Sequence, residues 1–344
     1  MKLLKKLYEI SSPSKSEQVM CKFIKSLLLG MKVDFMEDKY GNIYATKGES
    51  DTYPCVVCHT DEVHDVRSAG YKVVRHNDLM FAVNENTMEF EGIGADDKNG
   101  IWVCLRALND FDIVKCAFFV SEEVGCVGSS RADMKFFDDC RFVLQCDRKG
   151  SKDFIINASG TELCSSEFVE ACHINEFGYE VQKGMMTDVM TLKERGLAVS
   201  ACNISCGYYN PHTDNEMTRI SDLLNCYELV KSIIGNCTEV YEHDPYAYEE
   251  WEDKPDKYAP KFKSSTYDWW DYELGSHKTG ADDASAYNRE YDDMCEAMWD
   301  YTGWVEEKDF SLNDFIQMYG GCYPNLKRED FEFACQDIFG YVLN

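Results

Sequence analysis

The sequence predicts an α/β fold built around a largely parallel β-sheet. Over the first 240 residues, short apolar runs bounded by polar residues alternate with segments of helical periodicity. Four apolar runs are predicted to be buried strands, at 53–58, 116–120, 141–146 and 197–204. Residues with metal-ligating side chains follow these runs, at the sheet edge where α/β proteins usually bind ligands.

The other elements follow from local signals. Ser14–Glu17 has the pattern of a capping box, and the apolar spacing after it predicts a helix over 19–28 that ends at Gly30. The remaining expected elements are short strands at 33–35 and 43–46, strands or a flap within 66–91, and helices at 101–108 and 220–234. The residues expected on the apolar face of the last helix are Leu223, Leu224, Tyr227 and Val230.

The composition changes after residue 240. Residues 241–344 contain 25 Asp and Glu against 9 Lys and Arg, a net charge of −16, together with five of the six Trp. Disordered acidic tails are usually poor in aromatic residues. We therefore expect two domains: a domain over 1–240 that carries the site, and an acidic, Trp- and Tyr-rich extension over 241–344. The extension is expected to be partly helical, at 310–319 and 331–342, to pack partly against the core, and to offer a surface for protein contact.

Net charge and cysteine usage narrow the class of protein. A formal charge of −27 argues against nucleic acids and anionic membranes as partners. The 17 Cys lack the spacing of a disulfide framework, and the Cys55–Cys58 pair lies in a predicted buried strand without the second pair that a zinc knuckle needs. The sequence shows neither a signal peptide nor an apolar run of about 20 residues. We expect a soluble, cytoplasmic protein.

Five short motifs carry the candidate chemistry: His59-Thr60-Asp61, Gly94–Gly100, Glu122-Glu123, Asp147 and Asn210-Pro211-His212. Each has a structural alternative when taken alone, such as a helix cap for Asp96 or solvated loop acids for the glutamate pair. Together they offer imidazole and carboxylate ligands that suit two zinc ions. A carboxylate in a tight turn can bridge two metals. One of two adjacent glutamates can bind metal while the other takes a proton from metal-bound water. Asp188 is expected to cap the helix that begins near Val189.

The motifs His-x-Asp, Gly-Ala-Asp-Asp-Lys-x-Gly and Glu-Glu-x-Gly resemble those of the co-catalytic zinc peptidase superfamily. This superfamily includes zinc aminopeptidases, peptidase T, glutamyl aminopeptidases, carboxypeptidase G and acetylornithine deacetylase. The resemblance covers roughly residues 10–235 and implies a three-layer α/β/α sandwich around a mostly parallel mixed sheet. It also implies two zinc ions, with Co²⁺ or Mn²⁺ as substitutes. The implied metal ligands are His59, Asp96 as the bridge, Glu123, Asp147 and His212, with Glu122 as general base and Asp61 supporting His59.

The spacing of the motifs is most similar to that of the single-domain aminopeptidases. Asp147 and His212 are 65 positions apart, which leaves no room for the lid domain found between these motifs in deacetylases. The resemblance therefore implies hydrolysis of a peptide or small amide, most simply by an aminopeptidase. Two alternatives stay open: an amidohydrolase or deacylase acting on a non-peptide amide, and a zinc-binding scaffold that acts through its extension.

Overall fold

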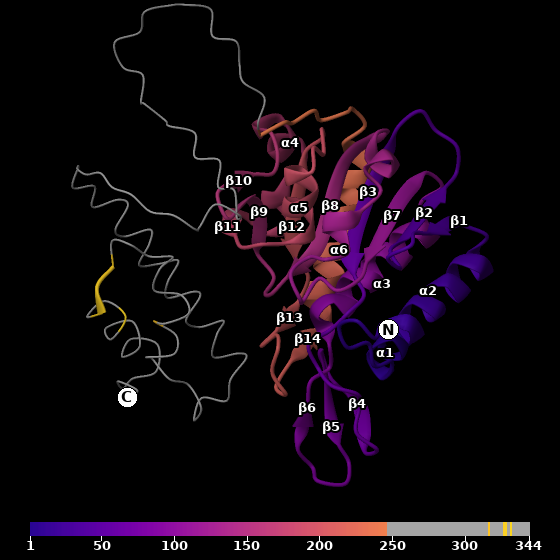
Figure 1. The fold of residues 1–344 in the computed structure, drawn as a ribbon, viewed down its shortest axis with the longest axis vertical. Helices are drawn as coiled ribbons and strands as arrows, with labels where there is room; N and C mark the ends of the chain where they lie inside the picture. Colours follow the sequence, from indigo (N-terminus) through magenta and orange to yellow (C-terminus); the bar gives the residue numbers. More distant parts are fainter. Residues whose placement is uncertain (246–315, 317–325, 329–330, 332–344) are drawn as a thin grey trace, which may run out of the picture. The chain divides into compact units, whose positions relative to one another are not determined.

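The computed structural model describes residues 1–245, 316, 326–328 and 331. The chain divides into two compact units, Met1–Tyr248 and Glu249–Asn344, and the helices and strands labelled in Figure 1 belong to the first unit. The expected helices at 310–319 and 331–342 lie outside the described residues, apart from 316 and 331. Of the expected extension, residues 241–245 belong to the first unit, where the backbone N of Tyr241 donates to the carbonyl of Arg141. The expected packing of residues 246–344 lies outside the described residues, apart from a few positions.

A nine-stranded mixed sheet forms the centre of the Met1–Tyr248 unit (Figure 1). Its middle strands pair in parallel, in the order β7 (Val114–Phe119), β3 (Tyr53–His59), β8 (Cys140–Arg148) and β12 (Ala201–Ser205). The flanking strands are β1 (Asp34–Glu37) and β2 (Ile43–Lys47) beyond β7, and β9 (Asp153–Ala158), β10 (Thr161–Glu162) and β11 (Glu180–Gly184) beyond β12. The flanks pair antiparallel except for β11 with β9. The predicted mixed sheet with a parallel centre is confirmed.

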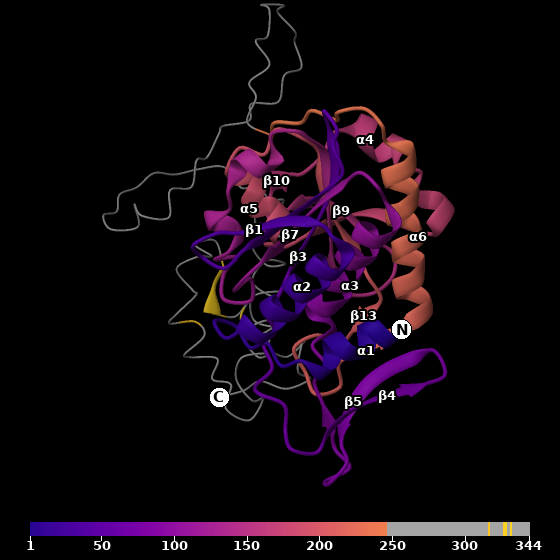
Figure 2. The ribbon, with the colours of Figure 1, turned by 90° about the vertical axis from the view of Figure 1, so that its right-hand side faces the viewer.

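Apolar side chains cover both faces of the sheet because successive residues of a strand point to opposite sides. In β3, Val56 and Cys58 belong to one apolar cluster, and Cys55 and Val57 to the other. The helices that pack on the first cluster are α1 (Lys2–Glu9), α2 (Gln18–Met31), α3 (Ala95–Asp110), α4 (Ser166–Ala171) and α6 (Ile220–Asn236). The second cluster is covered by α5 (Asp188–Glu194) and nearby 3₁₀ turns. This arrangement is the predicted α/β/α sandwich (Figure 2).

A second, antiparallel sheet of five strands lies beside the site. Its strands are β13 (Tyr208–Tyr209), β14 (Met217–Arg219), β5 (Leu79–Asn84), β4 (Tyr71–His76) and β6 (Phe90–Glu91). The strands expected within 66–91 are therefore present, and β4, β5 and β6 project from the body of the unit (Figures 1 and 2). Because β14 and β6 both pair with β5, the loop that carries His212 and the segment that leads into Asp96 belong to one sheet.

The predicted capping box is wrong. Helix α2 begins at Gln18 without a side-chain cap. Ser14 Oγ instead donates to Asp61 Oδ2 at 2.8 Å, and the carboxylate of Glu17 accepts from the backbone N (3.0 Å) and Oγ (2.9 Å) of Ser121. Both side chains are thus used in contacts with distant segments that border the site.

One predicted core residue and one predicted boundary also differ from the structure. Leu224 is 42% exposed, whereas Leu223 is fully buried, because adjacent residues of a helix point about 100° apart. The strand expected at 197–204 begins only at Ala201, after a turn that follows α5.

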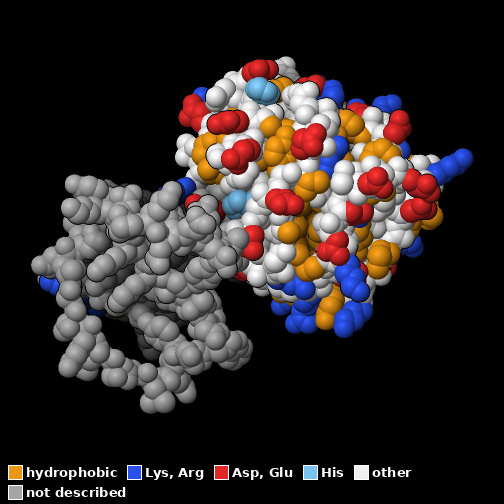
Figure 3. Space-filling view, turned by 90° about the horizontal axis from the view of Figure 1, so that it is seen from above, with side chains coloured by type: hydrophobic (Ala, Val, Ile, Leu, Met, Phe, Trp, Pro, Cys, Tyr) orange, Lys and Arg blue, Asp and Glu red, His pale blue; other side chains and the backbone are white. Residues whose placement is uncertain are grey.

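On the face seen in Figure 3, acidic side chains are scattered among uncharged ones, and one group of Lys and Arg side chains gathers at the lower edge. Within the described part of the chain, none of the helices has both the length and the apolar character needed to cross a bilayer.

Candidate metal centre

Six of the predicted site residues come together beyond the carboxyl ends of the central strands. His59 is the last residue of β3, and Asp147 is the penultimate residue of β8. Glu122 and Glu123 follow β7, Asp96 lies in the first turn of α3, and His212 lies between β13 and β14. The parallel order of β7, β3 and β8 brings the first four of these side chains to one edge, as the strand assignments predicted.

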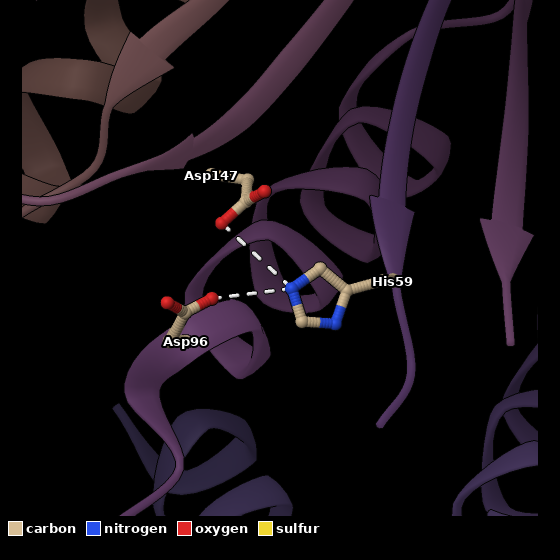
Figure 4. A group of neighbouring side chains, drawn as sticks. All are labelled: His59, Asp96 and Asp147. Carbon is tan, nitrogen blue, oxygen red and sulfur yellow. Dashed lines mark hydrogen bonds and ion pairs between the residues drawn. The ribbon is translucent and has the colours of Figure 1, made fainter. Parts of the chain in front are cut away.

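The first cluster consists of His59, Asp96 and Asp147 (Figure 4). His59 Nε2 lies 3.1 Å from Asp96 Oδ1 and 3.8 Å from Asp147 Oδ1. The candidate ligand atoms of the cluster lie within 4.8 Å of one another. Imidazole nitrogen and carboxylate oxygens converging at this spacing form a donor set for a divalent transition metal.

The second cluster consists of Asp96, Glu123 and His212. His212 Nε2 lies 3.4 Å from Asp96 Oδ2 and 3.2 Å from Glu123 Oε2. The two oxygens of Asp96 therefore face different clusters, one toward His59 and the other toward His212. This is the geometry of a carboxylate that can bridge two cations.

Asp61 connects the first cluster to the glutamate pair. His59 Nδ1 lies 3.1 Å from the carbonyl oxygen of Asp61 and 3.4 Å from its Oδ1. The Asp61 carboxylate also accepts from the backbone N of Glu122 (2.9 Å) and of Glu123 (3.2 Å), and from Ser14 Oγ. One buried carboxylate thus fixes both the histidine ring and the turn that presents the two glutamates.

The electrostatics of the site favour bound cations. Burial raises the pKa of Glu122, Glu123 and Asp147, and neighbouring carboxylates raise these pKa values further. The pKa of Asp96 is lowered despite its burial, because the two histidine rings interact with its oxygens. Among the described residues, Glu123 Oε1 is one of the few buried side-chain atoms without a hydrogen-bond partner. An acidic, buried donor set with an unpaired oxygen fits divalent cations.

The local backbone explains how Asp96 reaches both clusters. Gly94 has a φ of +64°, and a Cβ at this position would lie 2.0 Å from Glu62 Oε2, so glycine is required there. The backbone then departs from helical geometry at Asp96 and Asp97 before the regular part of α3 begins. Asp97 does not face the clusters; its carboxylate accepts from the backbone N of His59 (3.2 Å) and Gly100 (2.9 Å).

Several polar residues that support the site were not predicted. Gln145 Nε2 donates to Asp147 Oδ2 at 3.0 Å, and the hydroxyl of Tyr208 donates to Asp147 Oδ1 at 3.2 Å. Glu216 accepts from backbone groups of the segment that carries Asp96. The sequence held a usable signal for Gln145, which is a lone polar residue inside an apolar run. It held none for Tyr208 or Glu216.

The expectation that Asp188 caps α5 is wrong. The helix begins at Asp188 itself, and the N-cap residue is Thr187. The Asp188 side chain is fully buried, with Oδ2 accepting from Gln145 Nε2 at 3.3 Å and Oδ1 lacking a hydrogen-bond partner. Cys55 and Cys58, by contrast, are free and buried in β3, as the apolar run predicted.

Comparison with protein-family models and with curated proteins finds no match. Solved structures do match. An aminopeptidase PepT from Bacillus cereus ATCC 10987 has 16% sequence identity and a TM-score of 0.54, over 69% of this chain and 97% of that one. A tripeptidase from Staphylococcus aureus subsp. aureus Mu50 has 14% identity and a TM-score of 0.55, over 69% and 97%.

An aminopeptidase from the archaeon Desulfurococcus kamchatkensis gives a similar result, with 18% identity and a TM-score of 0.52 over 68% of this chain and 93% of that one. At such identities the likeness concerns the fold. This chain therefore has the α/β/α fold of these solved peptidases, which is the fold that its motifs predicted.

Proposed function

We propose that this protein is a peptidase that uses two zinc ions, and that it acts as an aminopeptidase. The observation that carries the proposal is the pair of three-residue clusters that share Asp96, beside a third group formed by His59, Glu122 and Glu123. The likeness of the fold to that of solved aminopeptidases and a tripeptidase supports it. The buried free cysteines of the described residues suit the reducing cytoplasm in which we place the protein.

The five proposed ligands divide between two ions. His59 and Asp147 would hold one and Glu123 and His212 the other, with Asp96, which lies near both histidine rings, shared between them. Two zinc ions bound in this way would lower the pKa of a shared water and polarise the scissile carbonyl. Zinc suits this mixture of nitrogen and oxygen donors, and Co²⁺ or Mn²⁺ would accept the same ligands.

Glu122 is the proposed general base. Its Oε2 lies 3.9 Å from His59 Nε2, so it borders the first cluster, and Glu123 contacts His212 in the second. Burial raises the pKa of Glu122, which makes its carboxylate a stronger proton acceptor than an exposed one. Glu122 takes a proton from the attacking water and passes it to the nitrogen of the leaving amine. Asp61 keeps His59 and the glutamate turn in place during this transfer.

The acidic site favours substrates that carry a free amine. A free amine bound beside Glu122 would be attracted by its carboxylate, which is not assigned to a metal ion. An aminopeptidase is therefore favoured over a deacylase, whose substrate has its amine blocked by an acyl group.

The test compares two substrates that differ only in the blocked amine. Zinc-loaded protein is assayed on a series of aminoacyl 4-nitroanilides and on their N-acetyl counterparts. We expect hydrolysis of the free-amine series and at least a hundredfold lower kcat/KM for the blocked series. Hydrolysis confined to the acetyl group would support a deacylase. Full zinc loading without hydrolysis of any amide would support a zinc-binding scaffold, and both results contradict the proposal.

A further inference from the structure

The loop that carries His212 lies largely at the surface, with one exception. Of residues 210–216, Glu216 alone is buried, although it bears a carboxylate. Glu216 Oε2 accepts from the backbone N of Gly94 at 2.6 Å, and Oε1 accepts from the backbone N of Asp96 at 3.0 Å. His64 Nε2 donates to Oε2 at 2.8 Å. A buried carboxylate with donors on both oxygens is held in one position.

These hydrogen bonds join the two segments that present Asp96 and His212. The segments are far apart in sequence, since Glu216 and Asp96 are separated by 120 positions. Most other side-chain hydrogen bonds of the loop stay within it, such as that from Thr213 Oγ1 to the carbonyl of Asn210. The exception is a longer bond of 3.3 Å from the backbone N of Gly92 to the exposed Asp214.

The two clusters differ in how their ligands are supported. His59 pairs with Phe119 in the β3–β7 ladder, and the backbone N and carbonyl of Asp147 are held by the Asn203 side chain at 3.0 and 2.7 Å, so both residues are fixed within the large sheet. The His212 side chain is 42% exposed on a short loop. Its distance from Asp96 depends on the hydrogen bonds by which Glu216 joins this loop to the segment that carries Asp96. The second cluster therefore depends on Glu216 more than the first does.

We propose that Glu216 is a positioning residue that sets the distance between Asp96 and His212. Through that distance, Glu216 sets the affinity of the second cluster for its cation. The inference rests on the proposed two-metal site and deepens it. A carboxylate is needed because both oxygens accept backbone N–H groups. The amide of a glutamine offers only one oxygen, and its NH₂ group would face the other N–H donor.

The test measures metal binding rather than activity. Co²⁺ is titrated by calorimetry and by visible absorption into metal-free wild-type protein and into metal-free Glu216→Gln. In the wild type we expect two equivalents to bind. In Glu216→Gln, the first equivalent should bind within about threefold of wild type, and the second should bind about 10–100-fold more weakly. The absorption of the second equivalent should change, since His212 is displaced from it.

The matched control is Asp78→Asn. Asp78 is also a carboxylate that accepts a backbone N–H, from Ser221 at 3.0 Å, together with Ser221 Oγ at 2.6 Å. Its backbone carbonyl accepts from the backbone N of Ile220, so Asp78 anchors the start of α6 rather than the segments that carry Asp96 or His212. Both equivalents should bind to this variant as they do to wild type.

Binding of the second equivalent to Glu216→Gln within twofold of wild type would overturn the proposal. Equal weakening of both equivalents would also overturn it, because it would indicate a general structural role. If far-UV circular dichroism shows that Glu216→Gln is unfolded, Glu216→Asp is titrated under the same criteria. Failure of both variants to fold counts against the proposal. A wild-type protein that binds fewer than two equivalents would contradict the proposed function itself, whereas an unchanged Glu216→Gln contradicts this inference alone.

Discussion

Replacing Glu122 by glutamine should abolish most of the activity while leaving the metal centre intact. The substitution keeps the shape of the side chain and removes its capacity to accept a proton. The surroundings can tolerate it, because Glu122 Oε1 accepts from Cys126 Sγ at 3.3 Å, a contact that an amide oxygen can also make. The backbone N of Glu122 still donates to Asp61 Oδ1. The change is therefore confined to proton transfer.

The expected loss follows from the position of the side chain. Glu122 is 13% exposed and lies 3.9 Å from a ring nitrogen of His59, so bulk water has little room to act as a substitute base. A general base contributes about 10²–10⁴-fold to the rate, which corresponds to about 2.7–5.4 kcal/mol of activation free energy. We expect kcat to fall by this factor and KM to change by less than about threefold.

The assay combines steady-state kinetics on an aminoacyl 4-nitroanilide with measurement of bound zinc. Glu123→Gln is the matched control, because Glu123 contacts His212 and should be needed for metal. Glu122→Gln should keep the zinc content of wild type, and Glu123→Gln should lose about half of it. A Glu122→Gln enzyme with at least a third of wild-type kcat would refute the role of base. Loss of zinc from Glu122→Gln but not from Glu123→Gln would mean that the two roles are exchanged.

Three further predictions address stability and ligation. Burial raises the pKa of Asp188 to about 6, so ionisation of this carboxyl group lowers the stability of the fold as the pH rises from about 4 to 6. In metal-free protein, Asp188→Asn should therefore increase the free energy of unfolding by about 1–2 kcal/mol at pH 7 and by much less at pH 4. Urea denaturation at the two pH values measures this difference. An equal effect at both pH values would contradict this. Tyr8→Phe removes a buried hydroxyl that is hydrogen-bonded to Asn99 and lies 2.7 Å from Thr218 Oγ1. It should lower the free energy of unfolding by about 1–3 kcal/mol in the same assay. An unchanged denaturation midpoint would show that these hydrogen bonds do not stabilise the fold. His212→Ala should reduce bound zinc from about two ions to about one, and unchanged zinc content would remove His212 from the ligand set.

The central strands, and the sheet edge at their carboxyl ends, could be predicted because each strand is marked by its own apolar run. The runs that became β3, β7 and β8 are apolar and are buried along most of their length, so each was recognisable without its neighbours. Parallel pairing then fixes where the residues after each strand must lie. His59 and Asp147 were placed at one edge by that reasoning.

Contacts between distant segments could not be predicted in this way. Glu17 matches the local pattern of a capping box, but Ser121, 104 positions away, uses its carboxylate instead. The sequence around Asp188 matches the pattern of a helix N-cap, but its side chain is buried and accepts a hydrogen bond from Gln145. Glu216 is an ordinary loop residue in sequence, and its importance follows only from its contact with the segment around Asp96. The supporting residues of the site are therefore less visible in the sequence than the candidate ligands.

The central claim is that two metal ions are held by clusters that share Asp96. Elemental analysis of protein purified without chelator and then dialysed against dilute zinc tests it directly, with Asp96→Ala as the matched variant. We predict close to two zinc ions per chain for the wild type and well under one for Asp96→Ala, because the shared carboxylate is lost from both clusters. Only a trace of transition metal in the wild type, or two ions retained by Asp96→Ala, would contradict the account.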